Sequence, residues 1–117
     1  MIDLTRIHGV YLASGYTDLR KSIDGYAAIV SGEYHLNPFS DSLFLFCNRQ
    51  RNKIKMIYWD GSGFWLLYKR LEQKHFKWPK NSNQQAMVIT HQQLSWLLGG
   101  LHVHQKTAFK RIKNVIL

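Results

Sequence analysis

A chain of 117 residues with a net charge of +9 at pH 7 is long enough for one domain with its own hydrophobic core. Hydrophobic residues make up 45% of it, which argues against a disordered chain, and its single cysteine, Cys47, excludes an intramolecular disulfide and fits a reducing compartment. No apolar stretch is long enough to span a bilayer and the first residues lack a signal-peptide pattern, so we expect a cytoplasmic protein without a membrane partner.

The positive charge is concentrated in two parts of the chain. Residues 49–80 contain nine basic and two acidic side chains, and residues 101–117 contain four basic side chains and no acidic one. Residues 1–48, in contrast, contain three basic and five acidic side chains. This distribution predicts a polyanionic partner, most simply nucleic acid. A basic surface that only keeps the protein in solution is the alternative.

The first part of the chain predicts a strand, a helix and a turn. Residues 7–13 alternate in the manner of a half-buried strand. A helix is predicted over residues 17–31 because apolar residues recur there at spacings of three and four. Either Thr17 or Asp18 can cap its start, since both side chains accept hydrogen bonds from free backbone N–H groups. Asn37-Pro38 then favours a turn.

The central part of the chain predicts an antiparallel meander. Residues 43–47 are apolar on both faces, which is typical of a central strand. Residues 53–59 and 64–71 are predicted strands, in which successive side chains point to opposite faces of the sheet. The Asp60-Gly61-Ser62-Gly63 sequence between them indicates a hairpin, because glycine accepts the positive φ of a tight turn. Pairing from this hairpin is expected to bring Lys53, Lys55, Lys69 and Arg70 together on one cationic edge, next to the turn at residues 48–52.

The part of the chain before residue 101 predicts a short strand and a helix. Residues 75–79 lie at an edge of the sheet or leave it, because the proline at position 79 cannot donate to a strand ladder. Residues 86–89 can add a strand. Thr90 and Gln93 match a capping box, which opens a helix that ends at two glycines after residue 98.

Together these elements predict the α+β class. One domain over residues 1–100 holds an antiparallel β-meander sheet with two helices packed on it. Residues 101–117 form a basic amphipathic C-terminal extension, either a helix or a tail. The chain shows no internal repeat and no interdomain linker.

Catalytic chemistry is poorly represented in this sequence. The six histidines and the cysteine do not make a zinc-binding set, so we predict no metal and no cofactor. A nuclease could draw on the carboxylates of Asp18, Asp24, Asp60 and Glu72 to hold magnesium. Capping explains Asp18, however, and the turn explains Asp60. There is also no nucleophile motif and no phosphate-binding loop. We therefore predict that the protein is not an enzyme.

Basic side chains interspersed with aromatic ones are what remains. Lysine and arginine contacts to phosphates supply affinity for nucleic acid, and exposed aromatic rings can stack on unpaired bases. The candidate rings are Tyr58, Trp59, Trp65, Tyr68, Phe76 and Trp78, although aromatic residues at alternating strand positions are more often core. The predicted phosphate contacts are Arg49, Arg51, Lys53, Lys55, Lys69, Arg70, Lys74 and Lys77. Secondary contacts are predicted at Arg20, Lys21, Lys110 and Arg111.

Four motifs resemble those of a known family. They are TDLRKSIDGYA from residue 17, NPFS from residue 37, LFLFCNRQRNKIKMIYWDGSGFWLLYKRLE from residue 43, and FKWP from residue 76. In this order they are similar to the TnpB, or second-open-reading-frame, accessory proteins of the insertion-sequence-sixty-six family, over residues 7–100. Ser22 and Ile23 stand where that family often has glycine and phenylalanine, and the tail after Leu101 has no clear counterpart.

The resemblance implies a bacterial mobile-element protein that is encoded beside a separate transposase. That transposase would carry the acidic catalytic centre, and no catalytic residue is implied for this chain. We therefore predict a transposition accessory protein that binds DNA without catalysis through the basic edge of the meander. The alternative is a protein-interaction module that recruits or positions the transposase with no direct DNA contact.

Overall fold

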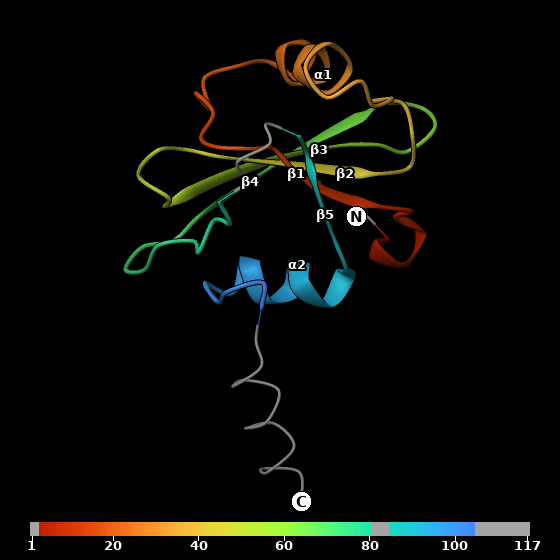
Figure 1. Ribbon diagram of the computed structural model, residues 1–117. Helices are drawn as coiled ribbons and strands as arrows, with labels where there is room; N and C mark the ends of the chain where they lie inside the picture. The colour runs from red at the N-terminus through yellow and green to blue at the C-terminus, as the bar shows by residue number, and fades with distance from the viewer. Residues whose placement is uncertain (1–2, 81–84, 105–117) are drawn as a thin grey trace, which may run out of the picture.

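One five-stranded sheet organises the fold (Figure 1). The computed structural model describes residues 3–80 and 85–104. Its elements in chain order are a 3-10 helix η1 (Leu4–Arg6), β1 (Val10–Leu12), α1 (Ile23–Gly32), β2 (Leu43–Cys47), β3 (Lys53–Trp59), β4 (Phe64–Arg70), β5 (Met87–Ile89) and α2 (His91–Leu98). The strands lie in the order β4-β3-β2-β1-β5, and the structure confirms the predicted α+β class.

The predicted meander is present as β2, β3 and β4, which pair antiparallel in that order. The Asp60 side chain shapes the hairpin between β3 and β4: its Oδ1 accepts hydrogen bonds from the backbone N–H groups of Ser62 at 2.8 Å and Gly63 at 3.0 Å. Gly61 has a φ of 99°, which explains the glycine at that position. The turn chemistry read from the sequence therefore forms as predicted.

The sheet is mixed rather than purely antiparallel. β1 pairs parallel with β2 and antiparallel with β5. A parallel pair requires a crossover between its two strands, and α1 lies in that connection. The sequence did not predict this pair because β1 has only three residues and its partner strand is distant along the chain.

The first helix starts later than predicted. Ser22, not Thr17 or Asp18, is its N-cap, and the Ser22 hydroxyl accepts a hydrogen bond from the N–H of Gly25 at 3.3 Å. Asp18 instead accepts the backbone N–H of Arg20 at 3.0 Å, so the residues before the helix form a separate turn. The predicted end of the helix is confirmed, since α1 finishes at Gly32.

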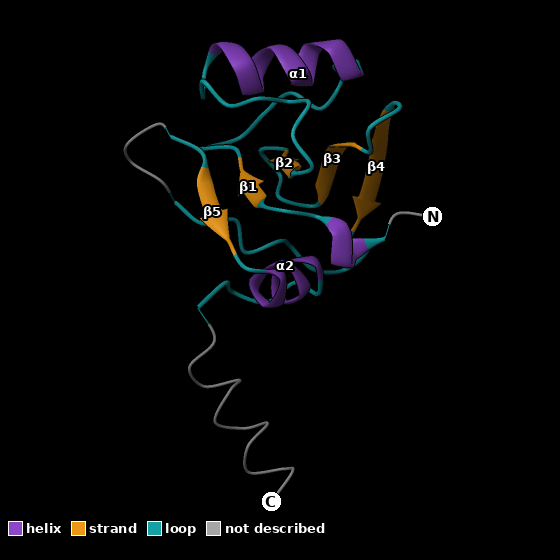
Figure 2. Cartoon of the chain, turned by 90° about the vertical axis from the view of Figure 1, so that its right-hand side faces the viewer, coloured by secondary structure: helices purple, strands orange, loops and turns teal. Residues whose placement is uncertain are grey.

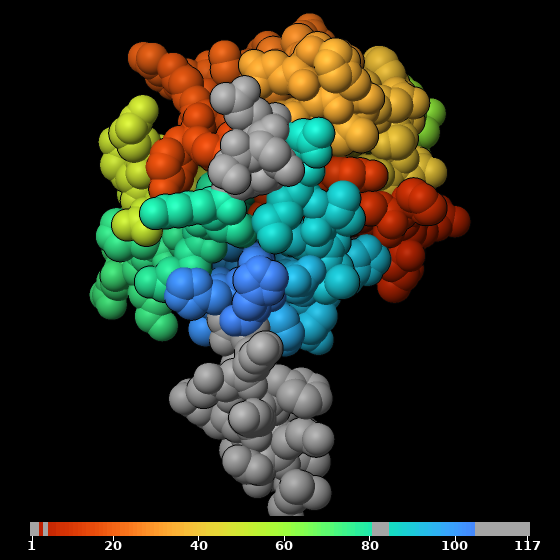
Figure 3. All heavy atoms as spheres, in the orientation of Figure 1, coloured from red at the N-terminus to blue at the C-terminus, as the bar shows by residue number. Residues whose placement is uncertain are grey.

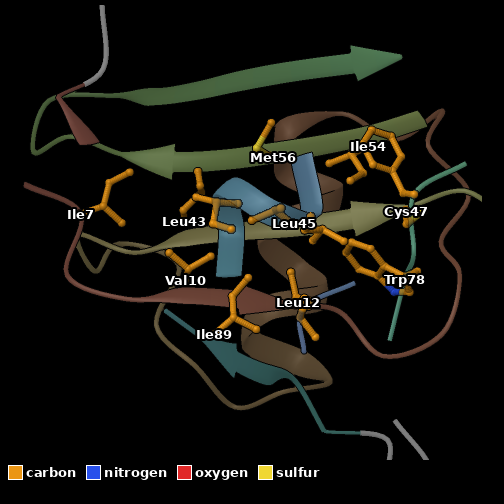
Figure 4. Packing of buried hydrophobic residues seen from close by; sticks show 14 of the residues in the cluster. Ile7, Val10, Leu12, Leu43, Leu45, Cys47, Ile54, Met56, Trp78 and Ile89 are labelled. Atoms are coloured by element: carbon orange, nitrogen blue, oxygen red, sulfur yellow. The ribbon is translucent and has the colours of Figure 1, made fainter. Parts of the chain in front are cut away.

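Helices cover both faces of the sheet, α1 on one and α2 on the other (Figure 2). This explains why all five residues of β2 are buried. Phe44 and Phe46 belong to the cluster on the α1 face, together with Tyr26 of the helix. Residues of β2 that point the other way belong to a larger cluster with Leu97 of α2, part of which Figure 4 shows.

The second helix begins with the predicted capping box. The N–H of Gln93 donates to the Thr90 hydroxyl at 3.0 Å, and the N–H of Thr90 donates to the Gln93 side chain at 2.8 Å. Beyond the helix, Val103 is buried in the cluster on the α2 face. Most of the predicted C-terminal extension, residues 105–117, lies outside the described residues.

Candidate nucleic-acid interface

Three loops meet at one end of the sheet, on the left in Figure 1. They are residues 13–22 after β1, residues 48–52 between β2 and β3, and residues 71–77 after β4. Backbone N–H groups join these segments by hydrogen bonds, from Thr17 to the Cys47 carbonyl at 2.8 Å, from Leu71 to that of Asn52 at 2.9 Å, and from Phe76 to that of Arg51 at 2.6 Å. We call this region, with Lys53 and Arg70 at the adjoining strand ends, the basic end.

A side-chain hydrogen-bond network shapes the loop at residues 48–52. The Asn48 carbonyl oxygen Oδ1 accepts from the N–H groups of Asn52 and Lys53, each at 3.1 Å, and its amide donates to Asn52 Oδ1 at 2.7 Å. Arg51 has a φ of 61°, a conformation that is uncommon for residues other than glycine. The Arg51 N–H donates to the Asn48 carbonyl at 3.0 Å. The loop therefore has a defined shape and presents exposed Arg49 and Arg51 from it.

The segment that carries the FKWP motif packs beneath this loop. Phe76 and Trp78 are buried, and the Trp78 indole N–H donates to the Ala13 carbonyl at 3.2 Å. Lys77 lies between them and is exposed. Phe76 and Trp78, like buried Tyr58, are therefore core residues, and of the predicted stacking candidates these three are excluded.

Acidic side chains at the basic end are few and are engaged by arginines. Arg20 Nη2 lies 2.7 Å from Asp18 Oδ2, and Arg70 Nε lies 2.8 Å from Glu72 Oε1. The hydrogen bonds from the Arg20 side chain and backbone hold the pKa of Asp18 well below its ordinary value. Both ion pairs are exposed and hence weak, so the two arginines can exchange these partners for phosphates.

Unpaired cations give this end its net positive charge. Within residues 3–80 and 85–104, Arg49, Arg51 and Lys53 form no ion pair with an acidic side chain. Asp41 precedes β2 and Asp60 follows β3, so both lie at the opposite end of the sheet. Charge is therefore separated along the strand direction.

Two hollows flank the loop at residues 48–52. One of about 280 Å³ is lined by Tyr16, Thr17, Asp18, Leu19, Asn48, Arg49 and Gln50. The other, of about 450 Å³, is lined by Arg51, Lys77, Trp78, Pro79, Lys80, Met87, His102, Val103 and His104. Figure 3 shows the three loops gathered on the left side of the molecular surface. The basic end is thus concave on both sides of the Arg49–Arg51 tip.

The predicted cations divide between the two faces of the sheet. Lys53 pairs with Arg70 across β3 and β4, and Lys55 pairs with Tyr68, so these residues share the α1 face. Lys69 points to the other face, where its ammonium donates to the Leu98 carbonyl at 2.7 Å. The expectation that Lys69 lies on one surface with the other strand cations is therefore wrong, because neighbouring strand residues point to opposite faces.

The remaining predicted contacts lie in the loops or outside the described residues. Arg20 and Lys21 are exposed in residues 13–22, and Lys74 and Lys77 are exposed in residues 71–77. Lys110 and Arg111 fall in residues 105–117, of which the structure describes nothing.

The sequence did not single out Asn48, which shapes the basic loop, nor Lys80, His102 and His104 in the second hollow. Lys80 was visible as part of the basic run. The two histidines stand on either side of Val103 in the sequence, a pattern that indicates metal ligands rather than phosphate contacts.

Two observations concern the residues that could take part in covalent or metal chemistry. Burial raises the pKa of the Cys47 thiol to about 12, so it stays protonated and poorly nucleophilic near neutral pH. Among the described residues, no three His, Cys, Asp or Glu side chains are placed to hold a metal ion together. The same part of the chain contains no helix with the length and apolar character that crossing a membrane requires.

Comparison with known proteins places this arrangement in a family. The sequence profile described as IS66 Orf2 like protein matches residues 8–108. The chain belongs to this family. Two proteins of Sinorhizobium fredii (strain NBRC 101917 / NGR234) are similar to it, and both bear the description uncharacterized protein. One, y4hO, is 38% identical over 92 residues, or 79% of each chain, and the other, y4jC, is 30% identical over 101 residues, or 86% of each chain. No solved structure matches.

Membership of the IS66 Orf2-like family supports an accessory role in transposition. Three of the motifs that carried the resemblance meet at the basic end: the one from residue 17 supplies Asp18 and Arg20, the one from residue 43 supplies the loop at 48–52, and FKWP packs beneath that loop. The basic end is therefore the candidate functional site of this family member.

Proposed function

We propose that this protein is a non-enzymatic accessory factor in the transposition of a bacterial insertion sequence, and that it binds DNA through the basic end. One observation carries the proposal: three loops, far apart in sequence and joined by hydrogen bonds, bring together six lysines and arginines of the described residues at one end of the sheet.

Phosphate binding follows from the shape and charge of this end. Arg49 and Arg51 project from a loop whose form is set by Asn48, so little ordering of the backbone is needed on binding. Guanidinium groups contact phosphate oxygens with two N–H donors at once. With acids such as Asp60 at the far end of the sheet, the charge separation orients the protein toward a DNA backbone.

A salt titration tests the proposal. For duplex DNA from the ends of the element, the logarithm of the association constant should fall linearly with the logarithm of the salt concentration. The slope should be roughly −0.9 per neutralised phosphate. An unrelated duplex of equal length measures the sequence-independent part. A flat response to salt would contradict binding through the basic end.

A matched pair of single variants locates the contact. Arg49→Gln removes one cation from the tip of the basic loop and should reduce the salt slope by roughly 0.9. Arg6→Gln removes the same charge from η1, which leads into the opposite end of the sheet, and should leave the slope unchanged. Equal effects of the two variants would mean that only net charge matters.

A second candidate function rests on an apolar hollow on the face of the sheet that α2 covers. It has a volume of about 440 Å³, and its lining includes Ile7, Leu94 and Leu98 with Lys69 and His91. An apolar side chain of the transposase would fit there, which is the protein-recruitment alternative. Pull-down of the transposase with the Arg49→Gln variant separates the DNA proposal from the recruitment alternative. If the variant still binds the transposase but binds DNA more weakly, the result supports the DNA proposal.

A further inference from the structure

The outer part of the sheet on the α1 face carries a second surface with nucleic-acid chemistry. Four residue pairs of the β3–β4 ladder point to this face: Lys53 with Arg70, Lys55 with Tyr68, Ile57 with Leu66, and Trp59 with Phe64. We call these eight residues the ladder face. Its first pair belongs to the basic end, so the ladder face is continuous with the proposed DNA contact.

The β4 half of the ladder face is largely uncovered. β4 is the edge strand of the sheet and lies beyond the end of α1 in Figure 2. Ile57 on β3 is buried, whereas Leu66 and Tyr68 on β4 have exposed fractions of 38% and 52%. A ring and an aliphatic side chain are therefore open to solvent beside the cations.

A cluster of aromatic rings closes the far end of the ladder face. The ring of Phe39, from the NPFS motif, lies 5.0 Å from that of Trp59 in an edge-on arrangement and 5.3 Å from that of Phe64. Trp59 and Phe64 are 5.1 Å apart. Phe39 itself is 55% exposed, which is high for a phenylalanine packed on two other rings.

A lysine lies close to the exposed Tyr68 ring. The Lys55 ammonium lies 6.0 Å from the centroid of the Tyr68 ring, within the range of a cation–π contact. The ladder face contains three cations and no acidic residue. A second copy of this chain would bring the same positive charge to it, whereas an anionic polymer complements it.

We propose that the ladder face binds single-stranded DNA, with an unpaired base stacked on Tyr68 and the neighbouring phosphates at Lys53, Lys55 and Arg70. The inference rests on the proposed function, because it extends the basic end's DNA contact to a strand that has left the duplex. A base inside a duplex has both faces stacked on its neighbours. Only an unpaired base can lie on an exposed ring of a sheet surface.

Fluorescence anisotropy with a labelled oligodeoxythymidine tests this inference. Tyr68→Ala should weaken binding by roughly 5- to 150-fold, the effect of losing one base–aromatic stack. It should leave binding to a duplex of equal length unchanged. Tyr68→Phe keeps the ring and should bind as the unaltered protein does. Lys55→Met, which keeps the aliphatic stem, provides a second variant and should lower the salt slope for the single strand by roughly 0.7.

The outcomes separate this inference from the proposed function. Unchanged oligodeoxythymidine binding by Tyr68→Ala, with a normal salt slope on duplex, overturns the inference and leaves the basic end as the DNA contact. A flat salt response on duplex overturns the proposed function itself. If Tyr68→Ala weakens binding to single-stranded and double-stranded DNA equally, the preference for a single strand is overturned. If the unaltered protein binds a matched oligouridine more tightly than the oligodeoxythymidine, the assignment to DNA is overturned. Tyr68-dependent self-association in sedimentation would assign the face to a second copy instead.

Discussion

Strands β2 and β4 are both rich in apolar residues, yet the structure uses them in opposite ways. β2 has a strand on each side and a helix on each face, and every one of its residues is buried. β4 has one neighbouring strand, and Trp65, Leu66 and Tyr68 are more than a third exposed on it. Position in the sheet, rather than composition, decides which apolar side chains build the core. Apolar residues left exposed at an edge are then available for binding.

The largest expected difference between the two strands is in stability. Phe46→Ala in β2 should lower the free energy of unfolding by about 3–5 kcal/mol, since it leaves a cavity beside the Tyr26 ring 4.8 Å away. Tyr68→Ala in β4 should cost about 1 kcal/mol or less, because half of that side chain is already in water. Urea denaturation followed by circular dichroism measures both. Phe46→Leu serves as the control and should fall between them. A Tyr68→Ala loss as large as that of Phe46→Ala would show that β4 is part of the core.

A smaller effect is expected from acid at the hairpin that holds β4 to β3. Backbone N–H groups of Ser62 and Gly63 and the Trp65 indole bond to Asp60 and lower its carboxyl pKa to about 2. A carboxyl whose pKa is lower in the folded than in the unfolded state stabilises the fold above the unfolded value. This contribution should be lost as the pH falls from about 4 to about 2. Urea denaturation across this range should show a weaker pH dependence for Asp60→Asn than for the unaltered protein. Identical profiles would contradict the role of the carboxylate.

The smallest expected difference between β2 and β4 is in the reactivity of a thiol on each strand. Cys47 in β2 is buried, and burial raises its pKa to about 12, so iodoacetamide at pH 8 should modify it only after unfolding. Leu66→Cys places a thiol on exposed β4 and should add one rapidly modified group, counted by mass spectrometry. Stability should change little. Rapid modification of Cys47 in the folded, unaltered chain would show that β2 opens readily.

Local patterns in the sequence predicted much of the sheet. The bounds of β2 and β3 are as predicted, because five consecutive apolar residues in β2, and apolar residues bounded by turn residues in β3, are strong local signals. The capping box of α2 was equally local. The start of α1 was not predictable in this way, since Thr17, Asp18 and Ser22 are all capping residues and only tertiary contacts choose among them.

For the candidate site, sequence predicted the cations but not all their directions. The register of β3 and β4 places Lys53 opposite Arg70 as the hairpin implied. Lys69 was misplaced because it was assigned to one surface with Arg70, although adjacent strand residues point to opposite faces. The contact of its ammonium with the Leu98 carbonyl could not be predicted, since α2 begins 22 residues after Lys69. The exposed ring of Tyr68 could not be told from the buried ring of Tyr58 for the same reason.

The pairing of β1 with β5 also bears on how the chain is made. β1 lies at residues 10–12, yet its second neighbour is β5 at residues 87–89. At the speed of ribosomal synthesis, about 5–20 residues per second, several seconds pass between the two strands. During this interval β2, β3 and β4 can already pair, while one edge of β1 stays open to other chains. A nascent chain interrupted before residue 87 would keep that edge exposed, and messages truncated there should yield aggregates rather than a smaller folded protein.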